Sequence, residues 1–431
     1  MSMKRVLIIT YYWPPSGGSG VQRWVKFSKY LPSQGWQPVI YTPENPDMPS
    51  IDQSLYSDIP GEAEIIKRPI TEIYSIYRRI SGNKGGGEVN PINSQKKTLK
   101  QKLMLAIRGN LFIPDPRISW LRPSVRFLKK YLREHPVDVI VSTGPPHSMH
   151  LIARKVSKAT GIPWVADFRD PWTRMFYFKH LALSDWARKK HEKLEKMVLD
   201  DASSVVAVSP LVQEEFKTMT GNRIELVTNG YDPEDFGQIV EPDGHFNIVH
   251  TGLFASDGNP ETLWKVLSDL CREDARFADQ LRIRLVGKND TMILDSIHTA
   301  GLERNLVDLG YRDHTVAVRE QMGSTMLILP LRKEPEYRAT LPGKLFEYLG
   351  SQRPVLGIGQ TDGAMARILA DTGAGETFEW DDEAGIRTYV LKRWEKFLAG
   401  DDDSVPDNNI EQYSRKATAR KMAALLESLI D

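Results

Sequence analysis

Glycine, histidine and charged residues follow short apolar runs at several places in the sequence. In the first half, residues 6–10 lead into a loop containing Gly17 and Gly18, and residues 138–142 lead to His147. Glycine backbone can approach an oxyanion where side chains would exclude it, so such a loop is typical of phosphate binding. A plain tight turn explains the same glycines equally well. A third apolar run is followed by Arg169 and Asp170, which could bind or transfer protons.

The second half repeats this arrangement. Gly252 and Lys288 each follow an apolar run, and Arg332 and Lys333 follow another. Lys344 comes shortly afterwards, at the start of a predicted helix. Backbone N–H groups at glycine-rich turns and nearby cations together suit a negatively charged ligand. Because the strand ends of both halves carry glycines and charges, we expect a ligand held in the cleft between the two predicted domains.

The pattern of apolar runs and helical stretches predicts an α/β protein with two doubly wound parallel sheets. Predicted strands comprise residues 6–10, 37–41, 138–142, 163–167, 204–208, 246–250, 282–286, 307–309, 325–329 and 354–358. Predicted helices include residues 21–31, 148–160, 184–200, 260–269 and 343–349. Ligands of such sheets bind at the carboxyl ends of the strands, where the residues named above lie. The predicted domains are 1–240 and 241–405, followed by a helical segment at 406–431.

Composition excludes several classes of protein. The 431 residues contain 57 Lys and Arg against 56 Asp and Glu, and a single cysteine, Cys271. One cysteine cannot form an internal disulfide, and the apolar run near the N-terminus is too short for a signal peptide. We expect a cytoplasmic protein, and the balanced total charge gives no reason to expect a nucleic acid partner.

The charge is unevenly distributed, however. Residues 67–133 hold 16 Lys and Arg but only three acids, and residues 97–130 combine cations with Leu111, Phe112, Ile113 and Trp120. This mixture could dock the first domain on an anionic membrane surface. The alternative is that the apolar residues face the core of ordinary helices while the cations are solvated.

Two longer motifs are more specific. "VTNGYDPEDF" at 227–236 resembles the hinge of family-4 glycosyltransferases, and "LPGKLFEYLGSQRPVL" at 341–356 resembles the helix with which that family contacts its nucleotide. "DVIVSTGPPHS", "GIPWVADFRD" and "HTGLF" are similar to the family's strand ends. The resemblance implies the GT-B fold, with two Rossmann-like domains and a C-terminal helix that packs back on the first.

The resemblance also implies a reaction. A retaining, metal-independent transferase would move a sugar from a nucleoside-diphosphate donor to a glycan or polyprenyl-linked acceptor, without a cofactor. The second domain would bind the donor and the first the acceptor. The Glu347 carboxylate would accept the ribose hydroxyls, and Arg332, Lys333 and Lys344 would face the diphosphate. The remaining candidates for donor binding are Gly17, Gly18, Gly252, Lys288, Thr340 and Leu345, and those for catalysis are His147, Arg169 and Asp170.

Two departures from the family pattern stand out. Ala339 occupies the position of the first of two glutamates, so donor-sugar contact must come from elsewhere, with Glu334, Glu336 or Thr340 as candidates. The Arg and Lys common after the first strand of the second domain are absent from "GLFASDGNPETL".

Two other functions remain open. A nucleotide-sugar epimerase of the same fold would need acid and base groups, for which only His147, Asp167 and Asp170 offer themselves. A non-catalytic nucleotide-sugar-binding protein would explain the missing glutamate.

Overall fold

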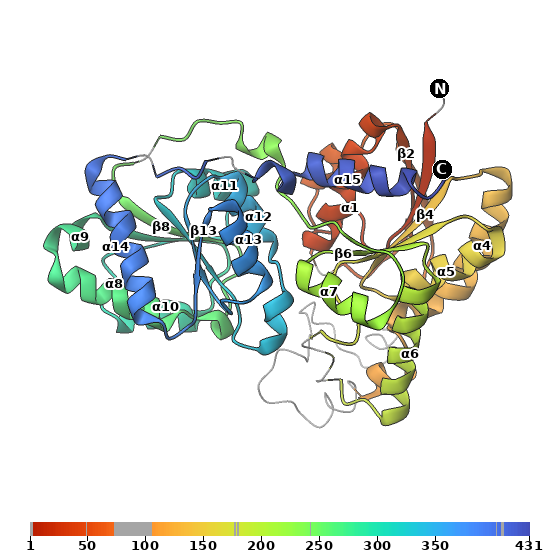
Figure 1. Cartoon of the computed structure of the whole chain (residues 1–431), viewed down its shortest axis with the longest axis horizontal. Coiled ribbons are helices and arrows are strands. Elements are labelled where there is room, and N and C mark those ends of the chain that lie inside the picture. The colour runs from red at the N-terminus through yellow and green to blue at the C-terminus, as the bar shows by residue number, and fades with distance from the viewer. Residues whose placement is uncertain are drawn as a thin grey trace. The chain divides into compact units, whose positions relative to one another are not determined.

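A computed structural model describes residues 3–48, 50–72, 106–175, 178, 181–241, 243–401, 403–406 and 409–431. The chain divides into two compact units (Figure 1). Unit 1 comprises Met1–Thr228 with Thr418–Asp431, and unit 2 comprises Asn229–Ala417. Each unit is a parallel sheet covered by helices, so the predicted α/β class with two doubly wound sheets is confirmed.

Unit 1 contains a seven-stranded parallel sheet in the order β3-β2-β1-β4-β5-β6-β7. Its strands are β1 Lys4–Ile9, β2 Trp36–Pro43, β3 Glu64–Arg68, β4 Val139–Gly144, β5 Trp164–Phe168, β6 Ser204–Ala207 and β7 Ile224–Leu226. Its helices are α1 Ser19–Tyr30, α4 Leu121–Glu134, α5 Ser148–Thr160, α6 Asp185–Asp201, α7 Pro210–Met219 and α15 Arg415–Glu427. The strand order reverses between β1 and β4, and this reversal is where a doubly wound sheet binds its ligands.

The helices of unit 1 begin and end at recognisable signals. The side chain of Ser184 caps α6 by accepting from the N–H of Ala187, and Ser209 caps α7 in the same way. Helix α5 ends at Gly161, whose φ of 77° lies in the left-handed region. These signals fix where each helix starts and stops relative to the strand that it follows or precedes.

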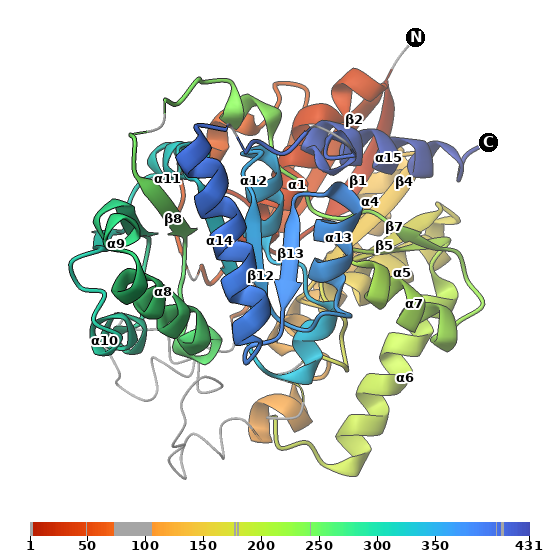
Figure 2. The same cartoon turned by 60° about the vertical axis from the view of Figure 1, so that its left-hand side comes forward.

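Helix α15 belongs to the core of unit 1. Ala419, Met422 and Leu426 are fully buried in the same cluster as Trp24 and Phe27 of α1. Figures 1 and 2 both show α15 beside α1. The C-terminal helix therefore completes an apolar layer that the first 228 residues leave unfinished.

Unit 2 contains a six-stranded parallel sheet in the order β10-β9-β8-β11-β12-β13. Its strands are β8 Phe246–Thr251, β9 Leu281–Val286, β10 Leu306–Gly310, β11 Met326–Pro330, β12 Val355–Ile358 and β13 Gly375–Phe378. Its helices are α8 Glu261–Glu273, α9 Ala275–Gln280, α10 Thr291–Thr299, α11 His314–Met322, α12 Gly343–Gly350, α13 Ala364–Thr372 and α14 Glu383–Ala399. Helices α8 and α14 pack side by side (Figure 2).

The chain divides at 228/229 instead of the predicted 240/241, because residues 229–240 pack on unit 2. The Tyr231 N–H donates to Tyr413 O at 3.1 Å, and its carbonyl accepts from the Arg415 N–H at 2.7 Å. A Cβ on Gly350 would lie 2.7 Å from the rings of Tyr231 and Phe236, so α12 needs glycine there. Residues 406–417, predicted to belong to the last segment, also lie in unit 2.

The apolar residues proposed to insert into a membrane do not form one exposed face. Ile113 and Trp120 are buried, the latter stacked on Tyr41 with ring centroids 4.7 Å apart. Phe112 is half-buried, and only Leu111 is well exposed, at 72%. The insertion of Ile113 and Trp120 was therefore a wrong prediction, since both pack in the protein. Lys97, Lys100 and Lys102 lie outside the described residues.

Candidate functional site

The loops after β8, β9 and β11 meet at the carboxyl edge of the unit 2 sheet. The Gly252 N–H donates to Val286 O at 2.6 Å, and the Phe254 N–H donates to Lys288 O at 3.0 Å. The Arg332 guanidinium lies 3.0 Å from the Asp257 carboxylate. Backbone and ion-pair contacts thus place the predicted residues of three strands at one site.

Two glycines allow this close approach. Gly252 has a φ of 84°, and a Cβ there would lie 3.0 Å from Lys344 Cε. Gly287 has a φ of 138°, and a Cβ there would lie only 2.2 Å from Gly252 O. Both backbone conformations strongly favour glycine. A side chain at position 252 would crowd Lys344, and one at position 287 would overlap the Gly252 backbone at the end of β8.

Lys344 reaches from the first turn of α12 to the end of β8. Its Nζ lies 2.8 Å from His250 Nε2 and donates to Leu253 O at 2.7 Å. Burial lowers the pKa of Lys344 to about 7, with Glu347 acting in the opposite direction. This lysine is therefore a cation whose charge is sensitive to pH near neutrality, and a bound phosphate would favour the charged form.

His250 is the neutral partner in this contact. It is buried, and burial together with Lys344 lowers its pKa well below the ordinary value. Its Nδ1 lies 3.1 Å from Ile328 O, so the proton belongs on Nδ1 and the Nε2 lone pair accepts from Lys344. Sequence reasoning missed His250, although its place near the end of the β8 run was a usable signal.

Glu347 follows Lys344 by one helical turn and is half-buried. Its Oε2 accepts from Gln321 Nε2 at 3.2 Å, and the same nitrogen donates to Thr251 Oγ1 at 2.9 Å. The Thr251 N–H donates to the Tyr348 hydroxyl at 3.0 Å. Gln321 thus orients the carboxylate while leaving acceptor capacity on it, as binding of a diol requires. Gln321 carried no signal in the sequence.

The other residues predicted to bind the donor differ in their surroundings. Lys288 and Lys333 are exposed. Arg332 is held by Asp257 and lies over the Tyr337 ring, 5.4 Å from its centroid. The Leu345 side chain is fully buried in the core, so only its backbone could face a ligand.

The position of the missing glutamate lies at the end of a short 3₁₀ helix, Pro335–Ala339, and Thr340 follows directly. Thr340 is half-buried, as is Glu336. Glu334 Oε2 is buried and has no hydrogen-bond partner among the described residues. A buried carboxylate oxygen without a donor is unfavourable, so Glu334 has capacity to accept from a sugar hydroxyl, and Oε2 of Glu336 is buried as well.

In unit 1, the glycine loop joins β1 to α1. The Gly17 N–H donates to Ser50 O at 3.0 Å, and a Cβ on Gly17 would crowd Ser50 Oγ at 3.0 Å. Gly18 precedes the first residue of α1 with a φ of 100°, and open space surrounds the position of its missing Cβ. Packing thus accounts for Gly17, while Gly18 borders space that a ligand could fill.

Arg169 holds the neighbouring strand ends together. It donates to the carbonyls of Gly20, Gly144 and Pro145. A Cβ on Gly20 would lie 2.3 Å from Arg169 Nη1, which explains the third glycine of the loop. The guanidinium is therefore engaged with backbone carbonyls, and it acts on the site by positioning these loops.

Asp170, the next residue after Arg169, differs from it because its side chain can change its protonation state near neutral pH. Burial raises the pKa of Asp170 to about 6, and Arg169 opposes this effect. Over the stretches of chain that the structure describes, its carboxylate has no hydrogen bond. A carboxyl group with this pKa can hold or release a proton near neutral pH.

His147 lies at a cavity of about 140 Å³. Its ring stacks on Trp172 with centroids 4.6 Å apart, and both ring nitrogens are buried without a hydrogen-bond partner among the residues that the structure describes. Burial, followed by His150 and Arg169, lowers its pKa well below the ordinary value, so the ring is neutral. The polar and aromatic residues lining the cavity include Tyr12, Asp115, Arg117, His147, Trp172 and His191.

Asp167, considered as an acid or base, is instead a structural residue. It forms a fully buried ion pair with Arg23 at 2.8 Å and accepts from Trp24 Nε1 and Thr143 Oγ1. Arg23 also donates to the carbonyls of Val227 and Thr228. The Asp167 carboxylate already accepts from Arg23, Trp24 and Thr143. Asp167 is therefore not available as an acid or base of the kind that an epimerase would need.

Neither a metal cluster nor a membrane span is found in the part of the chain that the structure describes. No three His, Cys, Asp or Glu side chains there are placed to bind one ion. No helix there combines the length and the apolar character needed to cross a bilayer.

Comparison with solved structures identifies the fold. The fold matches sucrose-phosphate synthase from Thermosynechococcus elongatus (TM-score 0.63, 13% identity, 99% of each chain covered). It also matches a glycosyltransferase from Rickettsia africae (TM-score 0.65, 13% identity, 100% of each chain covered). The S. aureus protein TarM matches with a TM-score of 0.60 and 11% identity over 98% of this chain and 100% of that one. No curated protein matches with significance.

The fold is therefore that of the GT-B glycosyltransferases, as the resemblance predicted. Residues 92–235 match the description "Glycosyltransferase Family 4". The family match covers about a third of the chain, and the GT-B fold extends over both units.

Proposed function

We propose that this protein is a retaining, metal-independent hexosyltransferase that uses a nucleoside-diphosphate sugar. The observation that carries the proposal is Lys344, held by His250 and Leu253 O beside the glycine backbone at the end of β8. It supplies a cation where the β8 loop lacks the usual Arg and Lys. Glu347, one turn later, has acceptor capacity for ribose hydroxyls.

The reaction follows from these groups. The bond between the sugar and the leaving phosphate breaks as the acceptor hydroxyl forms a new glycosidic bond on the same face. Its proton passes to an oxygen of the leaving diphosphate, so no separate base is needed. Lys344 stabilises the charge that develops on that diphosphate. Lys288, Arg332 and Lys333 are placed around the same strand ends to add to this field.

The acceptor is proposed to bind unit 1. The cavity beside His147 offers an aromatic surface from Trp172 and polar groups from Asp115 and Arg117. Asp170 and His147, whose side chains have no hydrogen bond within the described part of the chain, can accept hydrogen bonds from hydroxyl groups. Among similar folds are a lipopolysaccharide outer core galactosyltransferase and a second transferase of lipopolysaccharide biosynthesis. We therefore propose a surface glycan or a lipid-linked glycan as acceptor, used in the cytoplasm at an anionic membrane.

The test begins with binding. A thermal-shift screen over nucleoside diphosphates should reveal one base that raises the melting temperature, since a ligand of the folded state alone stabilises it. TarM has been seen in complex with UDP, and a trehalose-6-phosphate protein of E. coli with UDP-2-fluoro glucose, so uridine compounds come first.

The matching nucleotide sugar then decides the chemistry. Slow donor hydrolysis without acceptor, giving a sugar with retained anomeric configuration, would support a retaining transferase. An isomerised nucleotide sugar would instead identify an epimerase. A donor that binds and stays intact, with or without glycan acceptors, would identify a non-catalytic binding protein. Activity abolished by a chelator and restored by a divalent cation would contradict metal independence.

A further inference from the structure

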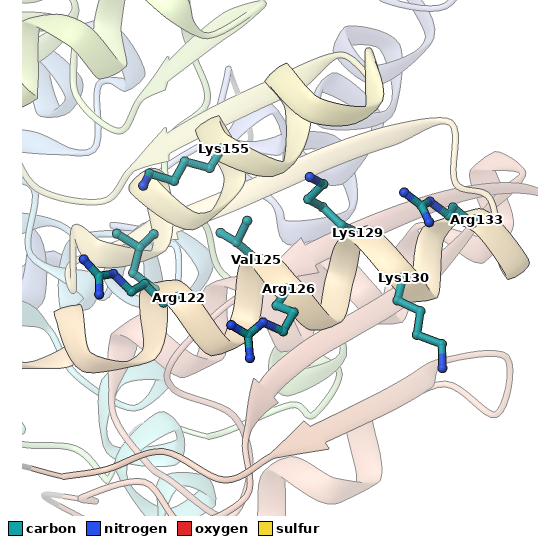
Figure 3. A pocket seen from close by; sticks show the side chains of 8 residues that line it. Arg122, Val125, Arg126, Lys129, Lys130, Arg133 and Lys155 are labelled. Atoms are coloured by element: carbon teal, nitrogen blue, oxygen red, sulfur yellow. The ribbon is translucent and has the colours of Figure 1, made fainter.

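Helix α4 carries a row of cationic side chains on its solvent face, and the neighbouring helix α5 adds one further cation, Lys155 (Figure 3). An open groove of about 480 Å³ between them, here called the α4 basic groove, is lined by Leu121, Arg122, Val125, Arg126, Lys129, Lys130, Arg133 and Lys155. All six cations are exposed, whereas Leu121 and Val125 are half-buried. The solvent-exposed side chains that line the groove are therefore all cationic.

None of these six cations has an ion pair or a hydrogen bond among the described residues. Two other cations of α5 do have acidic partners. Arg154 and Lys158 both pair with Asp201 of α6, at 2.5 and 2.7 Å. Acidic partners are thus supplied on one flank of α5 and absent on the other. The charge of the α4 basic groove is uncompensated within the described part of unit 1.

The spacing of the cations on α4 makes this arrangement unfavourable in isolation. Arg122, Arg126 and Lys130 follow one another at intervals of four residues, as do Lys129 and Arg133. Residues four apart are neighbours on a helix surface, so like charges there repel. From Arg122 to Arg133 the row extends about 16 Å at 1.5 Å per residue. A partner that relieves the repulsion must present several negative charges over that length.

We propose that the α4 basic groove docks unit 1 on an anionic phospholipid surface. Phosphate headgroups fixed in a plane supply many charges over the required distance, and exposed lysines and arginines reach them without insertion. The half-buried Leu121 and Val125 offer little to a bilayer interior, so the contact is electrostatic and peripheral. The proposal rests on the proposed function in one respect, namely that a lipid-linked acceptor is found at such a surface.

The chemistry of the groove disfavours a small ligand and a nucleic acid. A single phosphate is bound by donors that converge and are partly buried, but these six side chains are exposed and spread along two helices. Stacking on bases needs exposed aromatic faces. Phe127 and Tyr131 of α4 are half-buried and stack on each other, with ring centroids 5.9 Å apart, and Phe127 also stacks on Tyr41 of the sheet.

The experiment is vesicle sedimentation of the full chain without donor or acceptor. Vesicles of phosphatidylcholine with about a third phosphatidylglycerol are compared with phosphatidylcholine alone. The variant replaces Arg126, Lys129 and Lys130 by Gln, which keeps helix propensity. Its control replaces Lys416, Arg420 and Lys421 of α15 by Gln. These three are also exposed, and the substitution removes the same types and number of charges from another helix.

The parent protein should bind the anionic vesicles only, and binding should fade at high salt. Each cation near an anionic leaflet strengthens binding roughly fivefold, so the α4 variant should bind about a hundredfold more weakly. The α15 control should bind within a few-fold of the parent. Equal losses in both variants, or no binding by the parent at low salt, would overturn the proposal. Binding to duplex RNA at a salt concentration that abolishes vesicle binding would assign the groove to nucleic acid instead.

Donor hydrolysis in the same preparations separates this proposal from the proposed function. Both variants leave the unit 2 strand ends unchanged, so hydrolysis should be the same in all three proteins. Hydrolysis without vesicle binding would refute the docking surface alone. Vesicle binding without hydrolysis or transfer would refute the proposed function alone.

Discussion

Lys344, which we propose to bind the donor diphosphate, differs from most lysines because its charge depends on pH in the neutral range. Burial places its pKa at about 7, whereas an exposed lysine titrates near 10.4. A bound diphosphate stabilises the ammonium form, so binding takes up a proton wherever the free protein has lost it. Affinity should therefore fall as pH rises above 7.

This gives a prediction that calorimetry can check. Between pH 7.5 and 9, affinity of the parent for its nucleoside diphosphate should fall by up to about tenfold per pH unit. Lys344→Arg should flatten this dependence, because a guanidinium stays charged throughout. A parent whose affinity is as flat as that of Lys344→Arg would show that the lysine charge is not used in binding.

A second prediction concerns the side chain of Glu347. Its carboxylate is oriented by Gln321 and has capacity for ribose hydroxyls. Loss of a charge-assisted hydrogen bond of this kind costs about 1.5–3 kcal/mol, so Glu347→Ala should weaken nucleotide binding by one to two orders of magnitude. Glu303→Ala, which removes an exposed carboxylate of unit 2, should leave affinity unchanged. Unaltered affinity in Glu347→Ala would remove this residue from the site.

The buried pair of Arg23 and Asp167 predicts a stability effect. Removing one partner of a buried ion pair leaves an uncompensated charge, so Asp167→Asn should lower the free energy of unfolding by about 3–5 kcal/mol in urea titrations. Glu383→Gln, which removes an exposed ion pair with Lys265, should change it by less than about 1 kcal/mol. A cost for Asp167→Asn as small as this would contradict the structural role.

The pH dependence of the same pair has a definite sign. Burial alone would raise the pKa of Asp167, but Arg23, Trp24 and Thr143 lower it below the ordinary value. The folded state thus holds its proton more weakly than the unfolded state. Stability from this group should be fully present above pH 4 and should be lost as pH falls below it.

At the scale of elements, the loop between β1 and α1 can be tested with a matched pair of glycines. Gly18 and Gly35 both have positive φ, 100° and 84°, and both have open space around the position of the missing Cβ. Valine at either position imposes backbone strain of about 1–3 kcal/mol. Only Gly18 lies at the carboxyl edge of the sheet.

Gly18→Val should therefore reduce sugar transfer far more than Gly35→Val, while their melting temperatures fall by similar amounts. The measurement is initial rate and thermal unfolding for both variants, at a temperature where each is folded. Equal transfer rates for Gly18→Val and Gly35→Val would show that the loop between β1 and α1 is a plain turn and does not approach a ligand.

The elements also show what sequence can predict. Strands such as β1 and β4 are continuous apolar runs because helices cover both faces of a parallel sheet. β3, β7 and β13 were missed because they are short edge-region strands with charged or polar residues, as in "EIIKR" and "GETF". Lys344 and Glu347 lie in one local motif, which the sequence displays. His250 and Gln321 join them only through tertiary packing, and Arg23 meets Asp167 across 144 positions.

At the scale of the whole molecule, the division into two units does not follow the order of the chain. Unit 1 takes its last helix from residues that follow unit 2 in the sequence. Met422 of that helix is fully buried in the core of unit 1. Met422→Ala should therefore destabilise unit 1 by about 2–5 kcal/mol, while Lys421→Ala, on the exposed side, should stay within about 0.5 kcal/mol. Equal melting temperatures for the two variants would show that α15 is dispensable to that core.

The discontinuity of unit 1 also sets an order of events during biosynthesis. A ribosome adds about 5–20 residues per second, so the helix that closes the unit 1 core emerges about 10–40 s after residue 228. Unit 2 is contiguous and can complete its own sheet in that interval. The apolar surface that α15 will cover stays exposed on the nascent chain until then, which makes this surface the natural binding place for a chaperone.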